Sequence, residues 1–263
     1  MDEPVLRRQD SRVDLPLMKF DANRDAMITP TPPALTEPLP ERAVMCFFHE
    51  VIRDLPDSHG ARQIGEFPRE LGGHKIYRVM HDEVPVAVFH PGVGAPLAVQ
   101  HFEKAIAAGG RSFVACGGAG AIRPGLAFGH IVVPDAAVRD EGTSFHYAAP
   151  ARVVQVDPAL VDTAVAVLAE HGIPQATGLT WTTDAPFRET PDRVRARRQE
   201  GCITVEMEAA AFLAAAQFRD VKFCQYLYAG DDLSGSAWDH RGWTTATVRA
   251  ELVHLAIAAA TRL

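Results

Sequence analysis

The sequence predicts a single-domain α/β protein, a three-layer αβα sandwich around a mixed central β-sheet. Its 263 residues fit one large domain with a substantial core better than two small domains. Short apolar runs rich in β-branched residues alternate along the chain with segments of helical spacing, as in open α/β sheets. Most of the strand-like runs end in glycine or acidic residues, at the place where such sheets bind ligands.

Composition narrows the class of protein. A chain with 47% hydrophobic residues is globular, and a formal net charge of -7 disfavours a nucleic acid or an anionic membrane as partner. No segment has the length and apolarity of a signal peptide or a membrane span, so we expect a cytoplasmic protein. The cysteines lack metal-ligand spacing, so we expect reduced core thiols and neither a metal nor an organic cofactor: Cys46, Cys116, Cys202 and Cys224.

Residues 1–40 are expected to form an arm, separate from the main domain at 41–263. The arm mixes charged residues with prolines, which block helices and sheet ladders alike. The sequence leaves open whether this arm is disordered or lies across a neighbouring subunit. Its prolines are Pro4, Pro16, Pro30, Pro32, Pro33, Pro38 and Pro40.

The first half of the main domain contains two glycine-rich segments, each directly after a predicted strand. These segments are 90–96 and 116–121, and turns of this kind let backbone amides approach a ligand. We therefore expect a shared cavity that includes Gly94, Gly117, Gly118 and Ala119. The expected strands are 43–48, 75–80, 84–90 and 111–115, and a helix is expected at about 97–108.

The second half continues the alternation of strands and helices. Pro158 suits the first turn of a helix that extends to residue 171. The other expected elements are strands at 129–134, 176–181 and 221–229, a charged helix at 191–200, and a C-terminal helix at about 244–262.

Two acidic motifs follow strands of this second half. In Thr204–Ala211 a β-branched pair leads through Glu206, Met207 and Glu208 into an alanine-rich helix. The expected strand at 221–229 is followed directly by Gly230-Asp231-Asp232. Because ligands bind at the carboxyl ends of strands in α/β sheets, we expect both motifs to meet at one edge.

The order of these motifs resembles the nucleoside phosphorylase and nucleosidase superfamily. The resemblance covers residues 43 to about 260, leaves the arm outside, and implies a phosphorylase/hydrolase-like fold. It also implies an enzyme that cleaves the bond between the sugar and the base of a nucleoside. In chain order the motifs are a strand with a glycine-rich turn, GGAGAI, GHIVVPDAAVRDEGTSFHY, TTDAPFRET, VEMEAAA and AGDDLSG.

The resemblance assigns the sugar to the VEMEAAA motif. It implies that Glu208 accepts hydrogen bonds from the ribose hydroxyls, that Met207 packs on the apolar face of the sugar, and that Glu206 shapes the same wall. A carboxylate suits this role because it accepts two hydrogen bonds and offsets the positive charge of an oxocarbenium-like transition state. Taken alone, acidic residues at a helix start favour the helix dipole.

The base is assigned to the AGDDLSG and TTDAPFRET motifs. Asp231 resembles the acid that protonates the leaving base, but Gly230 replaces the serine usual before it, so the acid is either Asp231 or Asp232. An Asp-Asp pair is otherwise ordinary turn or helix-cap chemistry. Phe187 resembles the aromatic that stacks on the base. The further candidate contacts are Asp184, Arg188, His146, Tyr147 and His240.

The acceptor of the sugar is the open question. The phosphate loop of the family's phosphorylases does not follow the first strand here, and Ala115 and Gly118 stand where those enzymes usually have an arginine and a threonine, which favours water positioned by Glu50. Phosphorolysis is the alternative, with phosphate held by Arg53, Arg123, Arg139 or a neighbouring subunit. A catalytically inactive nucleoside-binding module is the third reading. The resemblance also implies a homo-oligomer, a dimer or a hexamer, and leaves open whether the base is a purine or a pyrimidine.

Overall fold

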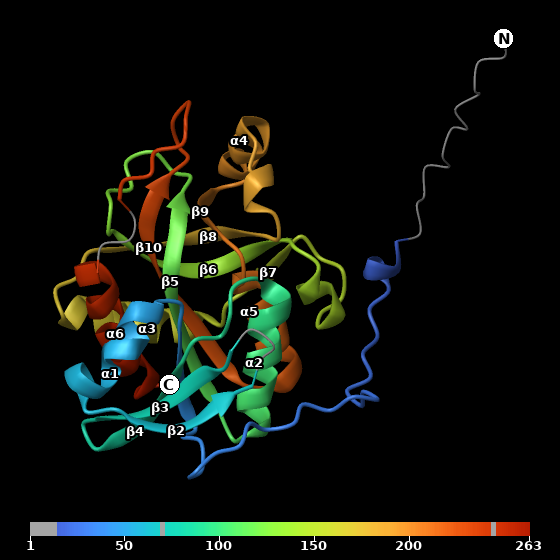
Figure 1. Cartoon of the computed structure of the whole chain (residues 1–263). Helices are drawn as coiled ribbons and strands as arrows, with labels where there is room; N and C mark the ends of the chain where they lie inside the picture. Colours follow the sequence, from blue (N-terminus) through green and yellow to red (C-terminus); the bar gives the residue numbers. More distant parts are fainter. Residues whose placement is uncertain (1–14, 69–71, 243–245) are drawn as a thin grey trace.

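The computed structural model describes residues 15–68, 72–242 and 246–263, and its centre is one mixed β-sheet (Figure 1). The long central strands are buried along most of their length because their apolar side chains are covered on both faces. The strands are β1 (Arg42–Cys46), β2 (Arg62–Phe67), β3 (His74–His81), β4 (Val84–Phe89), β5 (Ser112–Ala121), β6 (Ile131–Asp140), β7 (Val153–Gln155), β8 (Gln175–Thr183), β9 (Cys202–Glu206) and β10 (Lys222–Asp232).

The strand order is β10-β6-β8-β9-β5-β1-β4-β3-β2, and β7 pairs with β6. Strand β5 pairs in parallel with β1 and β10, whereas its end pairs antiparallel with β9. The additional pairing of β5 with β10 closes β10, β6, β8, β9 and β5 into a ring, while β1 to β4 extend outward as an open sheet. The ends of β5, β9 and β10 are thereby brought together.

Helices cover both faces of the sheet, which confirms the predicted three-layer arrangement (Figure 1). The helices α1 (His49–His59), α3 (Pro158–Glu170) and α6 (Ala246–Ala260) lie on one face, and α2 (Ala95–Ala107) and α5 (Ala209–Arg219) lie on the other. Helix α4 (Pro191–Gln199) packs near β9. Three short 3₁₀ helices are η1 (Pro16–Met18), η2 (Thr143–His146) and η3 (Pro186–Arg188).

Helix α3 begins as the sequence predicts. Pro158 occupies its first turn, and the Asp157 carboxylate accepts a hydrogen bond of 2.9 Å from the backbone N–H of Ala159. Helix α5 is buried from Ala209 to Ala216, because its small side chains let it pack closely against the sheet. The strand-to-helix transition predicted for the VEMEAAA motif is therefore confirmed.

The prediction of a glycine-rich turn after residue 115 is wrong, because β5 continues as strand to Ala121. The glycines serve close packing instead of a bend. A Cβ on Gly118 would meet the Tyr228 ring at 3.2 Å, and a Cβ on Gly120 would meet Leu233 at 2.5 Å. Strand β10 likewise continues to Asp232, beyond its predicted end at 229. Strands β2 and β7 were not among the strands predicted from the sequence.

The described part of the arm follows the main domain from outside. Arg24 forms an ion pair of 2.5 Å with Asp220 and lies over the Phe218 ring. Leu35 forms a β-bridge with Gly65, and Leu39 is buried in the core. Residues 1–14 of the predicted arm lie outside the described residues.

All four cysteines are buried and free, which confirms their predicted place in the core. Burial, together with the neighbouring Cys46, raises the pKa of the Cys116 thiol, so Cys116 stays protonated at neutral pH. Over the described residues, no helix has both the length and the apolar character needed to cross a bilayer.

Candidate functional site

A cavity of about 490 Å³ lies where β5, β9 and β10 end. Its size falls in the range of small-molecule sites. Residues 118–120 of β5 and 230–231 of β10 form one side, and Val205, Glu206 and Met207 at the end of β9 form another. Two loops supply the remaining lining residues, which are Pro186, Phe187, Glu189, Leu233 and Trp238.

Asp231 reaches this cavity because β10 carries a bulge. Ala229 pairs with Ala119 and Asp232 with Ala121, so Gly230 and Asp231 lie opposite the single residue Gly120. A bulge re-aims the side chains of its strand. The missing Cβ of Gly120 leaves room for the side chains of Leu233 and Val205, which lie 2.5 and 3.0 Å from where that Cβ would stand, and Oδ1 of Asp231 lies 3.4 Å from the same point.

The two neighbouring aspartates differ in their surroundings. Asp231 lines the cavity, and its Oδ2 accepts a hydrogen bond of 2.6 Å from the indole N–H of Trp238. Asp232 is outside the lining, pairs with the Arg241 guanidinium and accepts a hydrogen bond of 2.7 Å from the backbone N–H of Ser234. Asp232 therefore stabilises its own loop, and Asp231 is the better candidate for the acid.

Glu206 joins β8, β9 and α5. Its Oε1 accepts a hydrogen bond of 2.6 Å from the Thr182 hydroxyl, and its Oε2 accepts hydrogen bonds from the backbone N–H groups of Glu208 and Ala209 at 2.7 and 2.6 Å. Burial raises the pKa of Glu206 to about 7. Its carboxylate thus stabilises the start of α5 while its side chain lines the cavity.

Glu208 is buried beside the cavity and is not part of its lining. Its Oε1 accepts a hydrogen bond of 2.5 Å from the backbone N–H of Gly94, which leads into α2. Burial, and then the charge of Glu206, raises the pKa of Glu208 to about 8. The predicted trio of Met207, Glu208 and an aspartate is thus only partly assembled, since Met207 and Asp231 share the cavity and Glu208 lies next to Met207.

Aromatic side chains stand at the mouth of the cavity. Phe187 is 99% exposed and Trp238 is 60% exposed, although both line the cavity. A large apolar side chain that is left in water at the edge of a cavity is typical of a binding surface. Phe187 thus lines the cavity, and its role beside the base stays a prediction.

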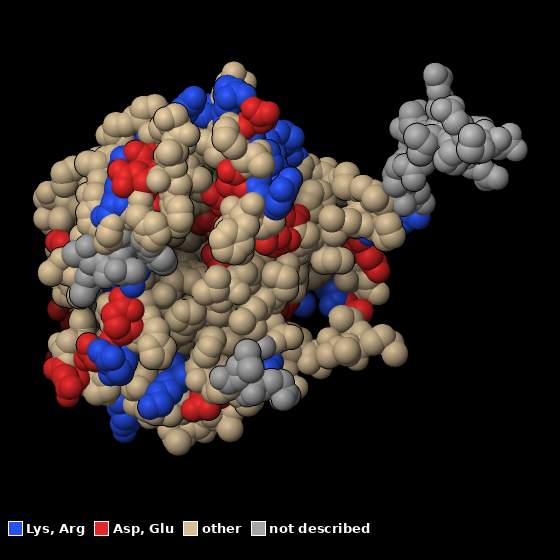
Figure 2. All heavy atoms as spheres, turned by 45° about the horizontal axis from the view of Figure 1, so that its top comes forward, with Lys and Arg blue, Asp and Glu red and all other residues tan. Residues whose placement is uncertain are grey.

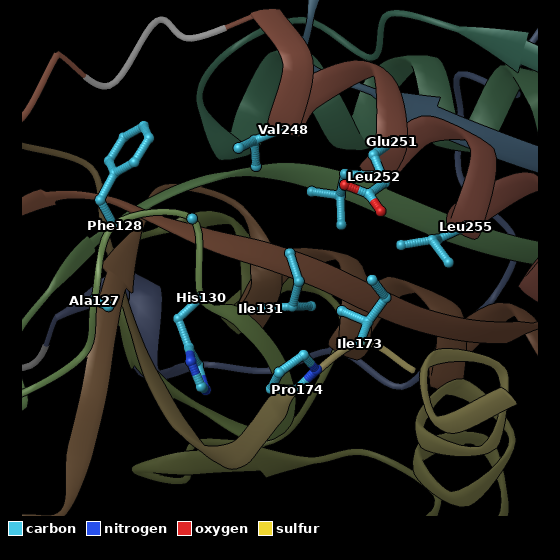
Figure 3. Close-up of a pocket in the computed structure, with 11 residues that line it drawn as sticks. Ala127, Phe128, His130, Ile131, Ile173, Pro174, Val248, Glu251, Leu252 and Leu255 are labelled. Atoms are coloured by element: carbon cyan, nitrogen blue, oxygen red, sulfur yellow. The ribbon is translucent and has the colours of Figure 1, made fainter. Parts of the chain in front are cut away.

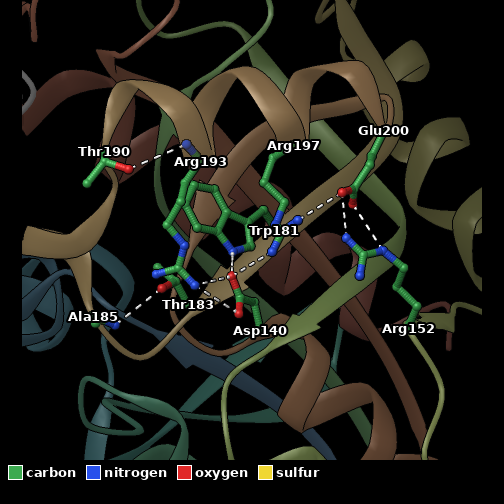
Figure 4. Close-up of polar contacts among 9 residues, drawn as sticks. All are labelled: Asp140, Arg152, Trp181, Thr183, Ala185, Thr190, Arg193, Arg197 and Glu200. Carbon is green, nitrogen blue, oxygen red and sulfur yellow. Dashed lines mark hydrogen bonds and ion pairs between the residues drawn. The ribbon is translucent and has the colours of Figure 1, made fainter. Parts of the chain in front are cut away.

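Helix α4, which follows the Phe187 loop, is fixed by a polar network (Figure 4). Asp140 at the end of β6 accepts hydrogen bonds from the Trp181 indole at 3.0 Å, from Arg193 at 3.0 Å and from Arg197 at 2.9 Å. Figure 2 shows Lys and Arg side chains gathered at the top of that view, where α4 lies. Since Arg193 and Arg197 pair with Asp140, much of this charge is compensated.

Several predicted contact residues lie outside the cavity lining. Asp184 accepts a hydrogen bond of 2.9 Å from the backbone N–H of Gly142, and Arg188 and His146 are exposed. Tyr147 packs edge-on against Phe218, and burial together with the nearby Glu103 carboxylate raises its pKa. His240 lies against the Trp238 ring, with ring centroids 4.1 Å apart.

Four residues of the two glycine-rich segments were predicted to share the cavity. Gly118 and Ala119 line it, whereas Gly117 and Gly94 do not. Gly117 faces the Phe47 ring, and Gly94 bonds to Glu208.

Glu50 is also outside the cavity lining. It forms an ion pair of 2.6 Å with Arg249 of α6, which in turn donates a hydrogen bond to the Tyr228 hydroxyl. Burial raises the pKa of Glu50, but the hydrogen bond from Arg249, a backbone hydrogen bond and the charges of Arg249 and His49 together outweigh burial, so the net shift of the pKa is downward. The structure therefore ties Glu50 to an arginine 199 positions later in the chain.

A second cavity, of about 530 Å³, contains several basic residues. Its lining includes His49, Arg53, His74, Lys75 and His90, and no acidic side chain among the described residues. Burial, followed by the charges of His74 and His49, lowers the pKa of His90 to about 4, so His90 is neutral at pH 7. Of the other arginines considered for phosphate, Arg139 donates to Ser144 and to two backbone carbonyls, and Arg123 is exposed.

A third cavity, of about 280 Å³, lies between α6 and the starts of β6 and β8 (Figure 3). Ile131, Ile173 and Leu252 make it largely apolar, and none of the predicted site residues lines it. Within 15–68, 72–242 and 246–263, no group of three His, Cys, Asp or Glu residues is arranged to hold a metal ion.

Two polar lining residues, Glu189 and Trp238, were not among the predicted site residues. Burial, and then the charge of Asp231, raises the pKa of Glu189 to about 7. Glu189 directly follows Phe187-Arg188 in the predicted TTDAPFRET motif, which was the available signal. Trp238 lies in a loop without a recognisable motif. Its closeness to Asp231 along the chain was the available signal that it could line the cavity.

Comparison with known proteins gives the chain a family. A sequence model described as "Phosphorylase superfamily" matches residues 41–262. A uridine phosphorylase of Thermococcus kodakarensis is 34% identical over 124 residues, which are 44% of this chain and 43% of that protein. A guanosine phosphorylase of Halorubrum lacusprofundi is 25% identical over 149 residues, covering 57% of this chain and 62% of that protein. Each of these matches spans less than two thirds of the relative's length.

Solved structures share the fold. A purine nucleoside phosphorylase of Toxoplasma gondii, in complex with immucillin-H, aligns with a TM-score of 0.75 at 19% identity, covering 86% of this chain and 92% of that chain. A uridine phosphorylase of Vibrio fischeri aligns with a TM-score of 0.73 at 16% identity, covering 86% and 93%. The predicted mixed α/β fold is thereby confirmed.

Proposed function

Because the chain belongs to the phosphorylase superfamily, we propose that it transfers the sugar of a nucleoside to phosphate, releasing the free base and a sugar 1-phosphate. The sequence analysis placed water first as the acceptor. The relatives named uridine phosphorylase and guanosine phosphorylase support its alternative, phosphate.

One observation carries the proposal: Met207 and Asp231 line the same cavity, beside the exposed ring of Phe187. These residues come from three different segments, and the reaction needs one group for each part of the substrate. A nucleoside bound here has an apolar contact for its sugar in Met207, an aromatic face for its base in Phe187 and a carboxyl group in Asp231.

In the proposed step, the bond between the anomeric carbon and the base nitrogen breaks, and its electron pair stays on the base. A phosphate oxygen forms the new bond to the same carbon. Asp231 donates a proton or a hydrogen bond to the departing base, which stabilises the charge that develops there. The hydrogen bond from Trp238 to Oδ2 of Asp231 leaves Oδ1 for the base.

Glu208 is assigned to the sugar. Its carboxylate, fixed by the Gly94 amide, lies directly after Met207 in the chain. When ionised, it accepts hydrogen bonds from sugar hydroxyls and offsets the positive charge of the oxocarbenium-like transition state. With a pKa of about 8, this ionised form becomes dominant only in mildly alkaline solution unless a ligand favours it.

Phosphate is assigned to the basic cavity. The loop from His90 to Gly94 runs from this cavity to Glu208, because His90 lines the cavity and Gly94 donates to Glu208. Lys75 and Arg53 supply the positive charges, since His90 is neutral, and the Arg53 guanidinium is shared with Asp54, to which it donates a hydrogen bond of 2.7 Å. These two side chains take the place of the phosphate-binding arginines of the family's pattern that this sequence lacks.

The structure offers less support for hydrolysis through Glu50. A residue that positions water needs a free carboxylate oxygen near the sugar, whereas Glu50 is paired with Arg249 and lies outside the cavity lining. The ion pair of Glu50 with Arg249 suits a structural contact between α1 and α6.

A direct experiment is to incubate the purified protein with uridine, inosine, guanosine and adenosine, with and without phosphate. We expect free base and sugar 1-phosphate only when phosphate is present. Free base and free sugar in phosphate-free buffer would select hydrolysis and reject the proposal. Nucleoside binding by calorimetry without release of base in either buffer would select the inactive binding module.

We also propose that the protein is a homo-oligomer, a dimer or a hexamer, as the family resemblance implies. Light scattering of the full chain in solution measures the number of subunits directly. A monomer at all concentrations used for the activity measurements would reject this part of the proposal.

A further inference from the structure

Two histidines hold the backbone of the loop at 90–94, which leads into α2. Nδ1 of His74 lies 3.0 Å from the carbonyl oxygen of His90. Nδ1 of His101 lies 2.7 Å from the carbonyl oxygen of Pro91. Because a carbonyl oxygen can only accept, both Nδ1 atoms carry a proton and donate. Two consecutive carbonyl groups of the loop are thus held by side chains of β3 and α2.

The imidazole ring of His101 is completely buried. The Phe67 ring of β2 stacks on it, with ring centroids 4.6 Å apart. The His74 ring stands edge-on to it, with ring centroids 5.0 Å apart. Since a buried polar group costs free energy unless it is hydrogen-bonded, this packing favours the orientation in which His101 donates to the loop.

The loop needs such contacts because it turns at two glycines. Gly92 and Gly94 have φ angles of +90° and +88°, in the left-handed region that glycine adopts easily. Glycine also has access to more backbone conformations than any other residue, so ordering these two positions costs conformational entropy. Within the loop, the backbone N–H of Gly92 donates to Nδ1 of His90 at 2.8 Å. Hydrogen bonds with histidine side chains therefore favour one conformation of the loop.

That conformation brings Gly94 to Glu208. Gly94 is the N-cap residue of α2, and its backbone N–H donates a hydrogen bond of 2.5 Å to Oε1 of Glu208. Burial and the charge of Glu206 raise the pKa of Glu208 to about 8, and the hydrogen bond from Gly94 opposes this rise. If the loop moved away, the Glu208 carboxylate would lose a donor, and its pKa would rise further.

We propose that His101, together with His74, is a positioning residue for the transfer reaction, because it fixes the loop whose Gly94 amide holds Glu208. This inference rests on the proposed function, which assigns Glu208 to the sugar. His101 itself does not touch the substrate, since it is completely buried and lies outside the lining of both the nucleoside cavity and the basic cavity. Its effect on the reaction passes through the loop.

The test compares His101→Phe with His101→Asn at saturating phosphate. Phenylalanine keeps a flat ring that stacks on Phe67 and removes the donor, whereas asparagine retains an N–H donor. In His101→Phe we expect kcat/KM for the nucleoside to fall roughly three- to tenfold, the effect of one lost hydrogen bond. The pH at which kcat/KM is half-maximal should move upward from about 8 by about half a unit to one unit. His101→Asn should return both values toward those of the wild type.

His171→Phe is the matched control. Nδ1 of His171 also lies 2.8 Å from a backbone carbonyl oxygen, that of Val167, but at the end of α3. This variant should leave the pH profile unchanged. An unshifted profile in His101→Phe, or an equal shift in His171→Phe, would overturn the positioning role and leave phosphorolysis in place. If His101→Phe does not fold, His74→Phe removes the neighbouring donor at a less buried position, and an unshifted profile there would also reject the proposal.

A second measurement does not depend on activity. If phosphate supports no cleavage, the proposed function fails, and amide hydrogen exchange still tests the loop. The backbone N–H of Gly94 should exchange faster in His101→Phe than in the wild type, because its bond to Glu208 opens more often. His101→Asn should restore slow exchange. Equal exchange rates at Gly94 in the three proteins would reject the role of His101.

Discussion

The indole N–H of Trp238 donates a hydrogen bond of 2.6 Å to Oδ2 of Asp231, although Trp238 itself is 60% exposed. The carboxyl group proposed to act on the base is thus held by a residue at the surface of the cavity. The ring of Trp238 also forms part of the cavity wall. Its two roles can be separated by substitution.

Trp238→Phe keeps an aromatic wall and removes the hydrogen bond to Asp231. We expect kcat to fall about tenfold or more, because a hydrogen bond to a charged group contributes roughly 1.5–3 kcal/mol. KM for the nucleoside should change less. Trp238→Ala is the matched comparison, since it also removes the wall and should raise KM. Steady-state kinetics with both variants measures the difference, and equal effects on kcat and KM in Trp238→Phe would contradict a positioning role.

Asp231→Asn should affect mainly catalysis, whereas Asp232→Asn should affect mainly stability. The first removes the proposed acid and should lower kcat by a factor of about 10² to 10⁴. The second weakens the contacts with Arg241 and Ser234 and should lower the unfolding temperature while most of the activity remains. Asp162→Asn, an exposed change on α3, serves as the control for the loss of one charge. A larger loss of kcat in Asp232→Asn would reverse the assignment.

The pH dependence of activity should report Glu208. Its pKa is raised to about 8 by burial and by the charge of Glu206, and only its ionised form accepts hydrogen bonds from both sugar hydroxyls. We therefore expect kcat/KM to rise with pH, to reach half of its maximum near pH 8, and to level off above that. Profiles of the wild type and of Glu208→Gln test this. Glu208→Gln should be less active and lack the rise, and an identical profile in the two proteins would exclude Glu208 as its source.

The same shift links folding stability to pH. In the unfolded chain Glu208 has a pKa near 4.5, so between about 4.5 and 8 the folded state binds more protons than the unfolded state. The contribution to stability is complete below about 4.5 and is lost as the pH rises through about 8. The unfolding temperature of the wild type should therefore fall from pH 5 to pH 9. This decrease in unfolding temperature should be smaller in Glu208→Gln. An equal dependence of the unfolding temperature on pH in both proteins would contradict the raised pKa of Glu208.

Asp140→Asn should destabilise the region around α4. It weakens the contacts of Asp140 with Trp181, Arg193 and Arg197 and removes the charge that faces both arginines, of which Arg197 keeps its ion pair with Glu200 (Figure 4). A loss of about 1–3 kcal/mol is expected, which corresponds to an unfolding temperature lower by several degrees. Because α4 follows the Phe187 loop, KM for the nucleoside should also rise. Asp135→Asn on the same strand is the control, since Asp135 is exposed.

Removing the charges of the basic cavity should affect phosphate more than the nucleoside. Arg53→Ala and Lys75→Ala are each expected to raise KM for phosphate about tenfold, the effect of one charge-assisted contact. Arg123→Ala is the matched control, because Arg123 lies outside both cavities. Initial rates at varied phosphate concentration give these constants. If only Arg123→Ala raised KM for phosphate, the acceptor would have to bind elsewhere.

Much of the architecture could be predicted from local sequence. The transition from strand to helix at Glu206-Met207-Glu208 follows from a β-branched pair before an alanine-rich run, and the start of α3 follows from Pro158. The extent of β5 could not be predicted, because glycine has the local signature of a turn. Its place in the strand depends on Tyr228 and Leu233, which lie more than 100 positions away.

Residues of the candidate site could be predicted only where they belong to a recognisable sequence motif. Met207, Phe187 and Asp231 lie in recognisable motifs, whereas the Glu50–Arg249 pair joins residues 199 positions apart and has no local signal. The choice between Asp231 and Asp232 required the register of β10 against β5. Glu189 could not be assigned because its environment comes from Asp231, in another part of the chain.

That register has a simple consequence. Between Ala229 and Asp232 the strand β10 holds two residues where β5 holds one. Removing Gly230 would restore an even ladder in which Asp231 pairs with Gly120 and Asp232 keeps its place opposite Ala121, so the bulge that re-aims the Asp231 side chain would be lost without any change in the chemistry of its carboxyl group. An insertion or deletion of one residue at this point is thus a sharper change to the protein than most substitutions elsewhere, because the count of residues, as much as their identity, determines whether the Asp231 carboxyl group faces the cavity.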